Sequence, residues 1–143
     1  MADTGRDIDL NVTRVFEKLW STIASGAPRH IIMPGGTRSS KTWSVLQALV
    51  MMCLHSGAHV DIIRAELSTI SRTVQLDLEE ILQDLGIYSE SMHNKTKNTY
   101  QIGTGKIRLM GCDQEDRLRG AKRDIAYINE ANEVSDEAAK QIE

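Results

Sequence analysis

A glycine-rich stretch between two apolar segments restricts the possible folds of this chain more than any other feature. The stretch runs from Gly35 to Thr42 and reads Gly-Gly-Thr-Arg-Ser-Ser-Lys-Thr. It follows the short apolar run His30–Met33 and opens the segment Lys41–His55, which is apolar on most sides and contains neither glycine nor proline. These patterns predict a buried strand, a tight turn and a buried helix, in that order.

The glycine-rich stretch closely matches the P-loop pattern G-x-x-x-x-G-K-[ST], with Ser40 in place of the second glycine. A P-loop curls so that successive backbone N–H groups point at phosphates, and the following helix adds partial positive charge. We expect Lys41 to reach the β- and γ-phosphates of ATP and the Thr42 hydroxyl to ligate Mg²⁺. The predicted nucleotide-binding residues are Gly35, Gly36, Thr37, Arg38, Ser39, Ser40, Lys41 and Thr42. A chance glycine turn before a helix is the alternative.

Hydrolysis of a nucleotide needs a second strand that ends in an acid near the γ-phosphate. Ile125–Ile128 has the character of a buried strand, and Asn129 and Glu130 follow it. We predict Glu130 as the catalytic base and Asn129 as a ligand of Mg²⁺ through water. A surface acid and a turn residue are the respective alternatives. Asparagine carries no negative charge, so we expect weaker Mg²⁺ attraction unless Asp124, Asp113 or another acid compensates.

The rest of the chain alternates between helical and strand patterns. The predicted elements are a helix over Asn11–Ser25, a strand over Val60–Arg64, a helix from Ser68 or Thr69 to Leu85, a hairpin of Asn98–Ile102 and Lys106–Met110, a basic connector over Leu118–Arg123, and a helix capped by Ser135. This alternation predicts an α/β fold with a mainly parallel sheet flanked by helices, that is, a P-loop NTPase of the ASCE type. We expect a flexible segment over 1–10 and a partial ATPase domain over 11–143, because such a domain normally needs further strands.

Composition and charge limit the possible partners. The net charge is -3, so the chain as a whole is not a basic nucleic-acid binder. The longest apolar run, Val45–Leu54, is too short to span a membrane, and no signal peptide opens the chain. Cys53 and Cys112 have no metal-site spacing and are expected to be buried free thiols in a reducing compartment. A soluble intracellular protein is therefore predicted.

One local segment is basic. Between positions 106 and 123 there are three acids and six basic residues, namely Lys106, Arg108, Arg117, Arg119, Lys122 and Arg123. Lysine and arginine side chains make the sequence-independent phosphate contacts that a DNA motor needs. The segment can equally be a solvated basic loop, so no DNA contact is assigned to a particular residue.

Three stretches together resemble the large terminase subunit of tailed phages, in particular the PBSX-type DNA-packaging ATPases. They are Gly35–Thr42, Ile62–Arg64 with Ser68–Val74, and Met110–Gly120 followed by Ile125–Glu130 and Ala131-Asn132-Glu133. The third is the discriminating one, because P-loops occur in many unrelated enzymes. The resemblance covers residues 27–137.

The resemblance implies an ATP-driven motor that pushes double-stranded DNA into a procapsid in the host cytoplasm. Such subunits act as a homo-oligomeric ring with a portal protein and a small terminase subunit. Each site is completed by an arginine finger, and Arg119 lies eleven residues before Glu130, where some members place a finger that acts in trans. Arg38 is the candidate in cis, although the family more often has its arginine at the position of Thr37.

Other expectations follow from what the resemblance does not cover. The family's coupling motif and its C-terminal nuclease domain are absent from these residues, so DNA cutting by that domain is not expected. The alternative functions are another P-loop DNA motor of the helicase or RecA type and a nucleotide-binding assembly module that does not turn ATP over. A small-molecule kinase is less favoured, because no arginine-rich lid region follows Glu130.

Overall fold

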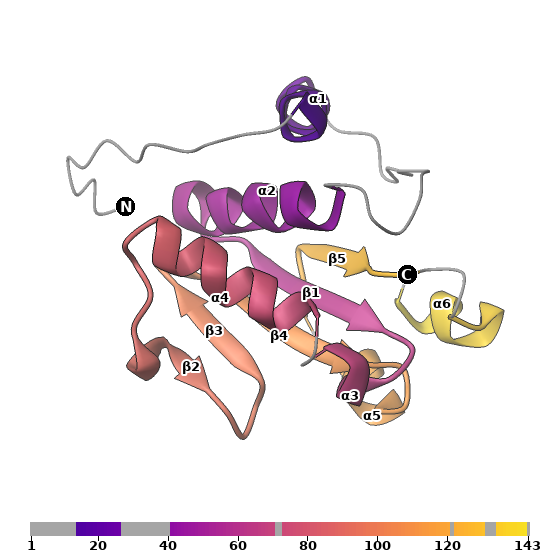
Figure 1. Ribbon diagram of the computed structural model, residues 1–143. Coiled ribbons are helices and arrows are strands. Elements are labelled where there is room, and N and C mark those ends of the chain that lie inside the picture. Colours follow the sequence, from indigo (N-terminus) through magenta and orange to yellow (C-terminus); the bar gives the residue numbers. More distant parts are fainter. Residues whose placement is uncertain (1–13, 27–40, 71–72, 121, 131–133, 143) are drawn as a thin grey trace.

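The computed structural model describes residues 14–26, 41–70, 73–120, 122–130 and 134–142 (Figure 1). The helices are α1 (Arg14–Ala24), α2 (Lys41–Ser56), α3 (Leu67–Ile70), α4 (Val74–Asp84), the 3₁₀ turn η1 (Glu90–Met92), α5 (Glu115–Gly120) and α6 (Asp136–Ile142). The strands are β1 (His59–Arg64), β2 (His93–Asn94), β3 (Thr99–Ile102), β4 (Gly105–Gly111) and β5 (Ile125–Ile128).

The strands form one sheet in the order β2-β3-β4-β1-β5. Strand β1 runs parallel to both β4 and β5, with Ile62 between Leu109 and Tyr127. Strands β2 and β3 extend the sheet in antiparallel fashion at the side of β4. The parallel pairs place the carboxyl ends of β1, β4 and β5 at one edge, which is where ligands bind in open α/β sheets.

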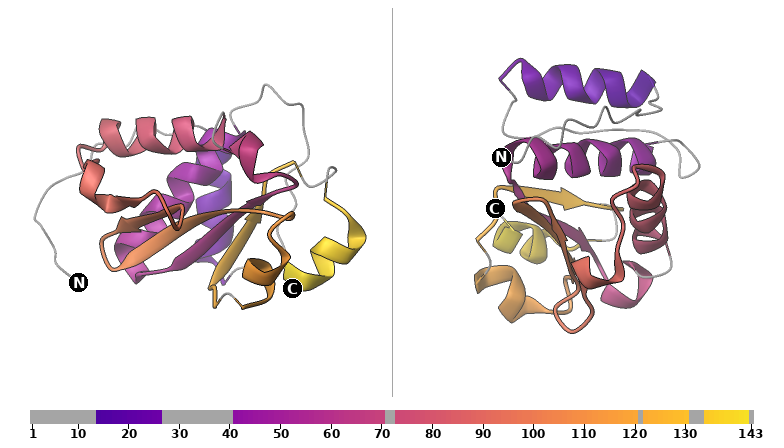
Figure 2. Two further views of the ribbon diagram at one scale, coloured as in Figure 1. Left: turned by 90° about the horizontal axis from the view of Figure 1, so that it is seen from below. Right: turned by 90° about the vertical axis from the view of Figure 1, so that its left-hand side faces the viewer.

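Helices cover both faces of the sheet (Figure 2). Helices α2 and α4 pack on one face, and α1 lies outside α2, contributing Phe16 and Leu19 to the same core cluster. On the other face, Leu118 of α5 and Ile142 of α6 pack with Ile63 and Met110. The predicted α/β class with a mostly parallel sheet flanked by helices is confirmed.

The long helix predicted from Ser68 or Thr69 to Leu85 is wrong as a single element. The structure has a short helix, α3, and then α4, whose N-cap residue Thr73 has φ −127° and ψ −70°. The hydroxyl of Thr73 accepts a hydrogen bond from Arg64 Nη1 at 3.0 Å. The apolar periodicity continues across this break, so the sequence pattern alone does not reveal it. The break is anchored instead by a tertiary contact with the end of β1.

Two other expectations change. The segment predicted as a basic connector over Leu118–Arg123 begins inside a helix, because α5 extends from Glu115 to Gly120. Strand β2 and the turn η1 add to the predicted elements, and β2 has only two residues, too few to leave a sequence pattern. The predicted cap is confirmed: the hydroxyl of Ser135 accepts a hydrogen bond from the N–H of Ala138 at 3.2 Å, and α6 follows.

The predicted strand His30–Met33 lies outside the described residues. None of the helices in the described part of the chain is long and apolar enough to cross a membrane. Both cysteines are free thiols as expected, although only Cys53 is fully buried and Cys112 is half-buried.

Candidate functional site

The first turn of α2 and the end of β5 meet at one point of the structure. Thr42 is the second residue of α2, and Asn129 directly follows β5. Asn129 Nδ2 donates a hydrogen bond to Thr42 Oγ1 at 3.4 Å, and Asn129 is 6% exposed. The two residues that were predicted as Mg²⁺ ligands from separate motifs are therefore neighbours in space.

The backbone explains why Asn129 faces α2. Its N–H donates to the carbonyl of Ile63 at 2.9 Å, which continues the parallel pairing of β5 with β1 by one residue. Side chains two residues apart lie on the same face of a strand, so Asn129 shares a face with Tyr127. Tyr127 packs against the core cluster that contains α2, and its hydroxyl accepts a second hydrogen bond from Asn129 Nδ2 at 3.1 Å.

Glu130 has an unusual backbone conformation at this edge. It is half-buried, and its φ is +55°, in the left-handed region that residues other than glycine rarely adopt. The chain therefore turns sharply directly after Asn129. Such left-handed residues are concentrated at functional sites, where the surrounding structure holds them in place.

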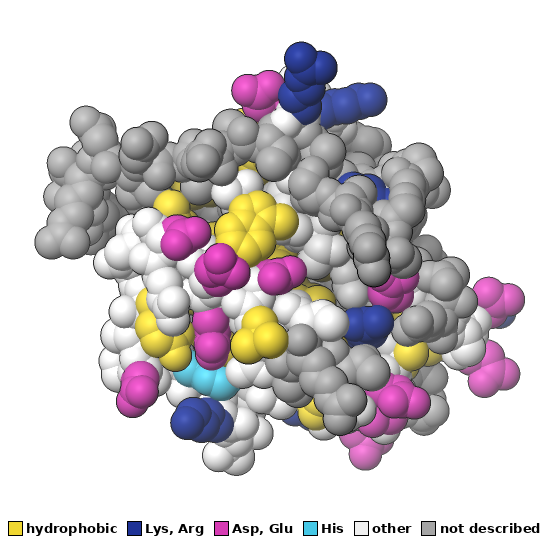
Figure 3. Space-filling view, viewed as in Figure 1, with side chains coloured by type: hydrophobic (Ala, Val, Ile, Leu, Met, Phe, Trp, Pro, Cys, Tyr) yellow, Lys and Arg dark blue, Asp and Glu magenta, His cyan; other side chains and the backbone are white. Residues whose placement is uncertain are grey.

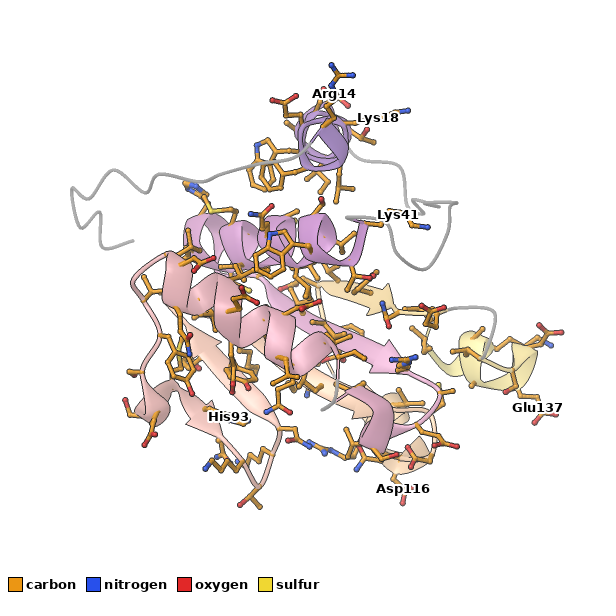
Figure 4. All side chains as sticks on the ribbon, in the orientation of Figure 1. Arg14, Lys18, Lys41, His93, Asp116 and Glu137 are labelled. Atoms are coloured by element: carbon orange, nitrogen blue, oxygen red, sulfur yellow. The ribbon has the colours of Figure 1, made fainter. Side chains whose placement is uncertain are left out.

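Lys41 precedes Thr42 and is half-buried. Figure 4 labels it at the end of α2 that lies nearest the tip of β5. The other predicted loop residues, Gly35–Ser40 with Arg38 among them, lie outside the described residues. Arg119 lies in α5, and its side chain is also outside the described part. The structure thus brings Thr42 and Asn129 together, with Lys41 and Glu130 next to them in the chain, and leaves the two candidate arginine fingers as predictions.

Asp124 and Asp113, the two acids named as able to compensate for Asn129, are both engaged elsewhere. Asp124 precedes β5, and its carboxylate accepts a hydrogen bond from the N–H of His59 at 2.8 Å, at the opposite end of the strand from Asn129. Asp113 follows β4, two strands away, and accepts from the N–H of Leu67 at 3.4 Å. Within the described residues, no group of three or more His, Cys, Asp or Glu side chains could hold a metal ion.

Two of the six basic residues in the segment 106–123 are bound to a buried acid. Asp61 lies within β1, and its carboxylate is 1% exposed. Arg108 donates to both of its oxygens at 2.6 and 3.0 Å, and Arg123 Nε donates at 2.6 Å. These guanidinium groups stabilise the interior and are not free for DNA phosphates. In the sequence, the one sign of this cluster is Asp61, a charged residue within an otherwise apolar strand.

Arg123 also connects the two helices on that side of the sheet. Its Nη2 donates to the carbonyl of Leu118 in α5 at 2.6 Å, and its Nη1 donates to the carbonyl of Ile142 in α6 at 3.1 Å. One side chain therefore fixes β1, α5 and α6 relative to one another.

The face of the sheet covered by α4, opposite to that covered by α5 and α6, carries many acidic side chains. Figure 3 shows acidic side chains gathered around apolar ones over α2 and α4, with few basic side chains among them. Helix α4 carries Asp77, Glu79, Glu80 and Asp84 and no basic residue. Helix α4 therefore offers none of the positive charge that contact with a DNA backbone requires.

The fold is that of the large terminases. The large terminase from a thermophilic bacteriophage superposes with a TM-score of 0.77 at 16% identity, over 93% of this chain and 36% of that one. A second structure of the same phage protein, in complex with ADP, gives a TM-score of 0.75 at 15% identity, over 92% of this chain and 35% of that one. This chain therefore spans about a third of the length of those proteins. No curated protein sequence matches it significantly.

The family is shown by sequence. Residues 28–143 match the family model described as phage terminase large subunit. The chain belongs to the phage terminase large subunit family, and the resemblance seen in its motifs is confirmed.

Proposed function

We propose that this chain is the nucleotide-binding part of an ATPase motor that packages double-stranded DNA into a phage procapsid. The contact of Thr42 with Asn129 carries the proposal, because the helix after the glycine-rich loop begins where the strand before Glu130 ends. This is the arrangement that a site for phosphate binding and hydrolysis requires. The fold shared with an ADP-bound large terminase supports it.

The side chains at this edge suit distinct tasks in ATP hydrolysis. The ammonium group of Lys41 would neutralise the β- and γ-phosphates. Glu130 would accept a proton from the attacking water, for which its carboxylate must lie within hydrogen-bond reach of that water. Arg119 from a neighbouring subunit, or Arg38 from the same loop, would stabilise the charge that develops on the transferred phosphoryl group.

The side-chain oxygens of Thr42, Asn129 and Glu130, at the carboxyl end of β5, are of the kind that Mg²⁺ prefers. This ion is commonly bound through one or two carboxylates together with waters and substrate phosphates. The Thr42 hydroxyl and the Asn129 amide would hold it, the latter through water, with Glu130 as the acid of the site. When bound, Mg²⁺ neutralises charge that develops on the phosphates. Because Asn129 is neutral, we expect weaker Mg²⁺ binding than an aspartate would give.

Nucleotide binding is tested by Lys41→Ala. Titration calorimetry with ADP and Mg²⁺ should give a much weaker affinity than wild type, because a phosphate-binding cation is lost. Lys18→Ala, on the exposed face of α1, is the matched control and should bind like wild type. Equal affinities of Lys41→Ala and wild type would refute the proposed site.

A second candidate function is favoured by Asn129. The missing negative charge suits a nucleotide-binding assembly module that does not turn ATP over. In the full-length protein, Glu130→Gln should stop ATP turnover and leave nucleotide binding intact if the motor function holds. If the full-length wild-type protein binds ATP but does not hydrolyse it with DNA and partners present, the module is the correct function.

The proposed partners follow from the family. They are double-stranded DNA, a portal protein, a small terminase subunit and further copies of this chain in a ring, all in the host cytoplasm. Because Arg119 would act in trans, we expect this chain alone, as a dilute monomer, to hydrolyse ATP little or not at all. Robust turnover under those conditions would remove the trans arginine from the mechanism.

A further inference from the structure

We propose that Arg123 is a positioning residue, which fixes helix α5 on the buried carboxylate of Asp61 and so sets the place of Arg119. The inference rests on the proposed function, in which Arg119 completes the nucleotide site of a neighbouring subunit. In the sequence, Arg123 is one of six basic residues between positions 106 and 123. The structure ties it both to β1 and to the helix that carries Arg119.

Helix α5 depends on contacts outside itself. It has six residues, Glu115–Gly120, whereas an isolated helix of fewer than about 12 residues is not stable in water. The Leu118 side chain is 1% exposed and packs with Ile63 and Met110. The carbonyls in the last turn of a helix have no partner within that helix. The Leu118 carbonyl accepts a hydrogen bond from Arg123 Nη2 at 2.6 Å, so Arg123 fixes the end of α5.

The other end of this link lies in the interior of the sheet. Arg123 Nε donates to a carboxylate oxygen of Asp61 at 2.6 Å, and the Asp61 side chain is 1% exposed. Strand β1, which contains Asp61, is hydrogen-bonded to β4 on one side and to β5 on the other. A further contact of α5, from Arg117 to the carbonyl of Lys97 at 2.9 Å, reaches an exposed turn instead. Because a guanidinium group is planar and rigid, Arg123 sets the distance between β1 and α5.

A buried ion cluster is suited to a positioning role. Taking charges out of water is costly, and apolar side chains of similar volume often stabilise a fold equally well. Apolar packing alone could therefore attach α5 to the sheet. The cluster of Asp61, Arg108 and Arg123 adds direction to that packing, because each hydrogen bond of a guanidinium group joins defined atoms in a defined geometry.

The link acts on Arg119 through one peptide group. The carbonyl of Leu118 belongs to the peptide bond between Leu118 and Arg119, and the six atoms of this group lie nearly in one plane. Arg123 therefore fixes the backbone nitrogen and Cα of Arg119 together with the oxygen that it binds. Misplacement of a catalytic group by about 1 Å can reduce a rate by about a hundredfold. An arginine that must enter the site of another subunit consequently needs a fixed helix beneath it.

The test uses mixed rings of the full-length protein. Acceptor subunits carry Arg119→Ala and keep their nucleotide site, whereas donor subunits carry Lys41→Ala and keep Arg119. Each variant alone should have little ATP turnover, and the mixture should regain part of it, because a donor completes the site of an acceptor. Arg123→Lys in the donor should lower the regained turnover by about ten- to a hundredfold. The same substitution in the acceptor, which has no arginine to position, should leave the turnover of the mixture in place.

Arg108→Lys in the donor is the matched control. Arg108 donates to both oxygens of Asp61 and to the carbonyl of Lys122, so this substitution weakens the same buried cluster and keeps the bond from Arg123 to Leu118. The regained turnover should stay near that of the original mixture. Hydrogen exchange of backbone amides gives a second readout that does not depend on ATP. Exchange over α5 should be faster in Arg123→Lys than in wild type, and unchanged in Arg108→Lys.

The outcomes separate this inference from the proposed function. Equal loss of turnover from Arg123→Lys in donor and acceptor would show a purely structural role and overturn the inference. Full turnover in Arg119→Ala alone would remove the trans arginine, and this inference with it, but leave an active motor. If wild type binds no nucleotide, the proposed function itself fails. Equal exchange over α5 in Arg123→Lys and wild type would then also show that Arg123 does not fix the helix.

Discussion

Asn129 Nδ2 lies 3.4 Å from Thr42 Oγ1 although the two residues are 87 positions apart in the sequence. The distance is long for a hydrogen bond, so the contact is weak. If Mg²⁺ binds Thr42 as proposed, loss of this contact from the Asn129 amide nitrogen would cost little free energy.

Replacing Asn129 with aspartate tests the electrostatics of this pair. Asn129→Asp places a carboxylate at a position that is 6% exposed. Without Mg²⁺ this substitution should lower the free energy of unfolding by about 1–3 kcal/mol, because a buried charge lacks a counter-ion. Mg²⁺ with ADP should restore more stability to this variant than to wild type, as measured by thermal unfolding.

Asn94→Asp, at an exposed asparagine of β2, is the control and should respond to Mg²⁺-ADP like wild type. If Asn129→Asp and wild type gained equal stability from Mg²⁺-ADP, Asn129 would not lie near the cation.

Asp61 is predicted to be essential for stability. Asp61→Asn leaves Arg108 and Arg123 half-buried without their counter-ion, at a cost of about 3 kcal/mol in the free energy of unfolding. Urea denaturation followed by circular dichroism measures it. Asp84→Asn, on the exposed end of α4, should change stability by less than about 0.5 kcal/mol.

If Asp61→Asn does not fold, Arg123→Lys provides a milder test. It keeps the charge and loses the donors that reach α5 and α6, so protease cleavage within those helices should become faster. If Asp61→Asn had the same free energy of unfolding as wild type, the buried cluster would contribute nothing to stability.

The stability of the chain should fall as the pH drops from neutral. The His93 side chain is 6% exposed and stacks on Tyr100 with ring centroids 4.1 Å apart. Burial lowers its pKa, with Glu79 opposing this effect and Lys95 adding to it. A pKa below the unfolded value of about 6.5 means that the unfolded chain binds the proton more readily. The stability that the buried neutral His93 contributes is therefore fully present above the unfolded pKa, and it is lost as the pH falls through the lowered pKa of the folded state.

The measurement is the urea midpoint between about pH 7.5 and 5, which spans the unfolded pKa of histidine. His93→Phe keeps a ring on Tyr100 and should flatten the pH dependence. His55→Gln, at an exposed histidine, should retain it. If the urea midpoint of His93→Phe depended on pH as steeply as that of wild type, titratable groups other than His93 would cause the loss of stability.

The two thiols should react at different rates. Cys53 is fully buried, its Sγ donates to the carbonyl of Ala58 at 3.4 Å, and burial raises its pKa to about 12. Cys112 is half-buried and thus more accessible, and burial together with Asp113 also raises its pKa. Iodoacetamide should therefore modify Cys112 first and Cys53 only after unfolding, as followed by mass spectrometry. Equal rates in the folded protein would contradict the buried position of Cys53.

Local patterns were sufficient for the elements that have strong periodicity or turn residues. The ranges of α2, β1 and β5 and the cap at Ser135 agree with what the sequence predicts, within a residue or two. The pairing of Thr42 with Asn129 followed because parallel strands end at one edge of a sheet. Such features depend on neighbours along the chain or on a general rule of topology.

Features that depend on distant contacts could not be predicted. The break before Val74 is tied to Arg64, and the cluster around Asp61 needs Arg108 and Arg123 from other elements. The contact between Tyr127 and Asn129 likewise forms only in the folded chain. A residue that acts through a side chain elsewhere leaves little trace in a linear pattern.

The left-handed backbone of Glu130 sets stability against activity at a single position. A residue with a Cβ atom is less stable in this conformation by about 1–2 kcal/mol, whereas glycine adopts it freely. Glu130→Gly should therefore raise the melting temperature of the fold and, if the carboxylate has its proposed role, abolish turnover in the motor. Selection for a more thermostable chain would then tend to eliminate the residue proposed as the catalytic base.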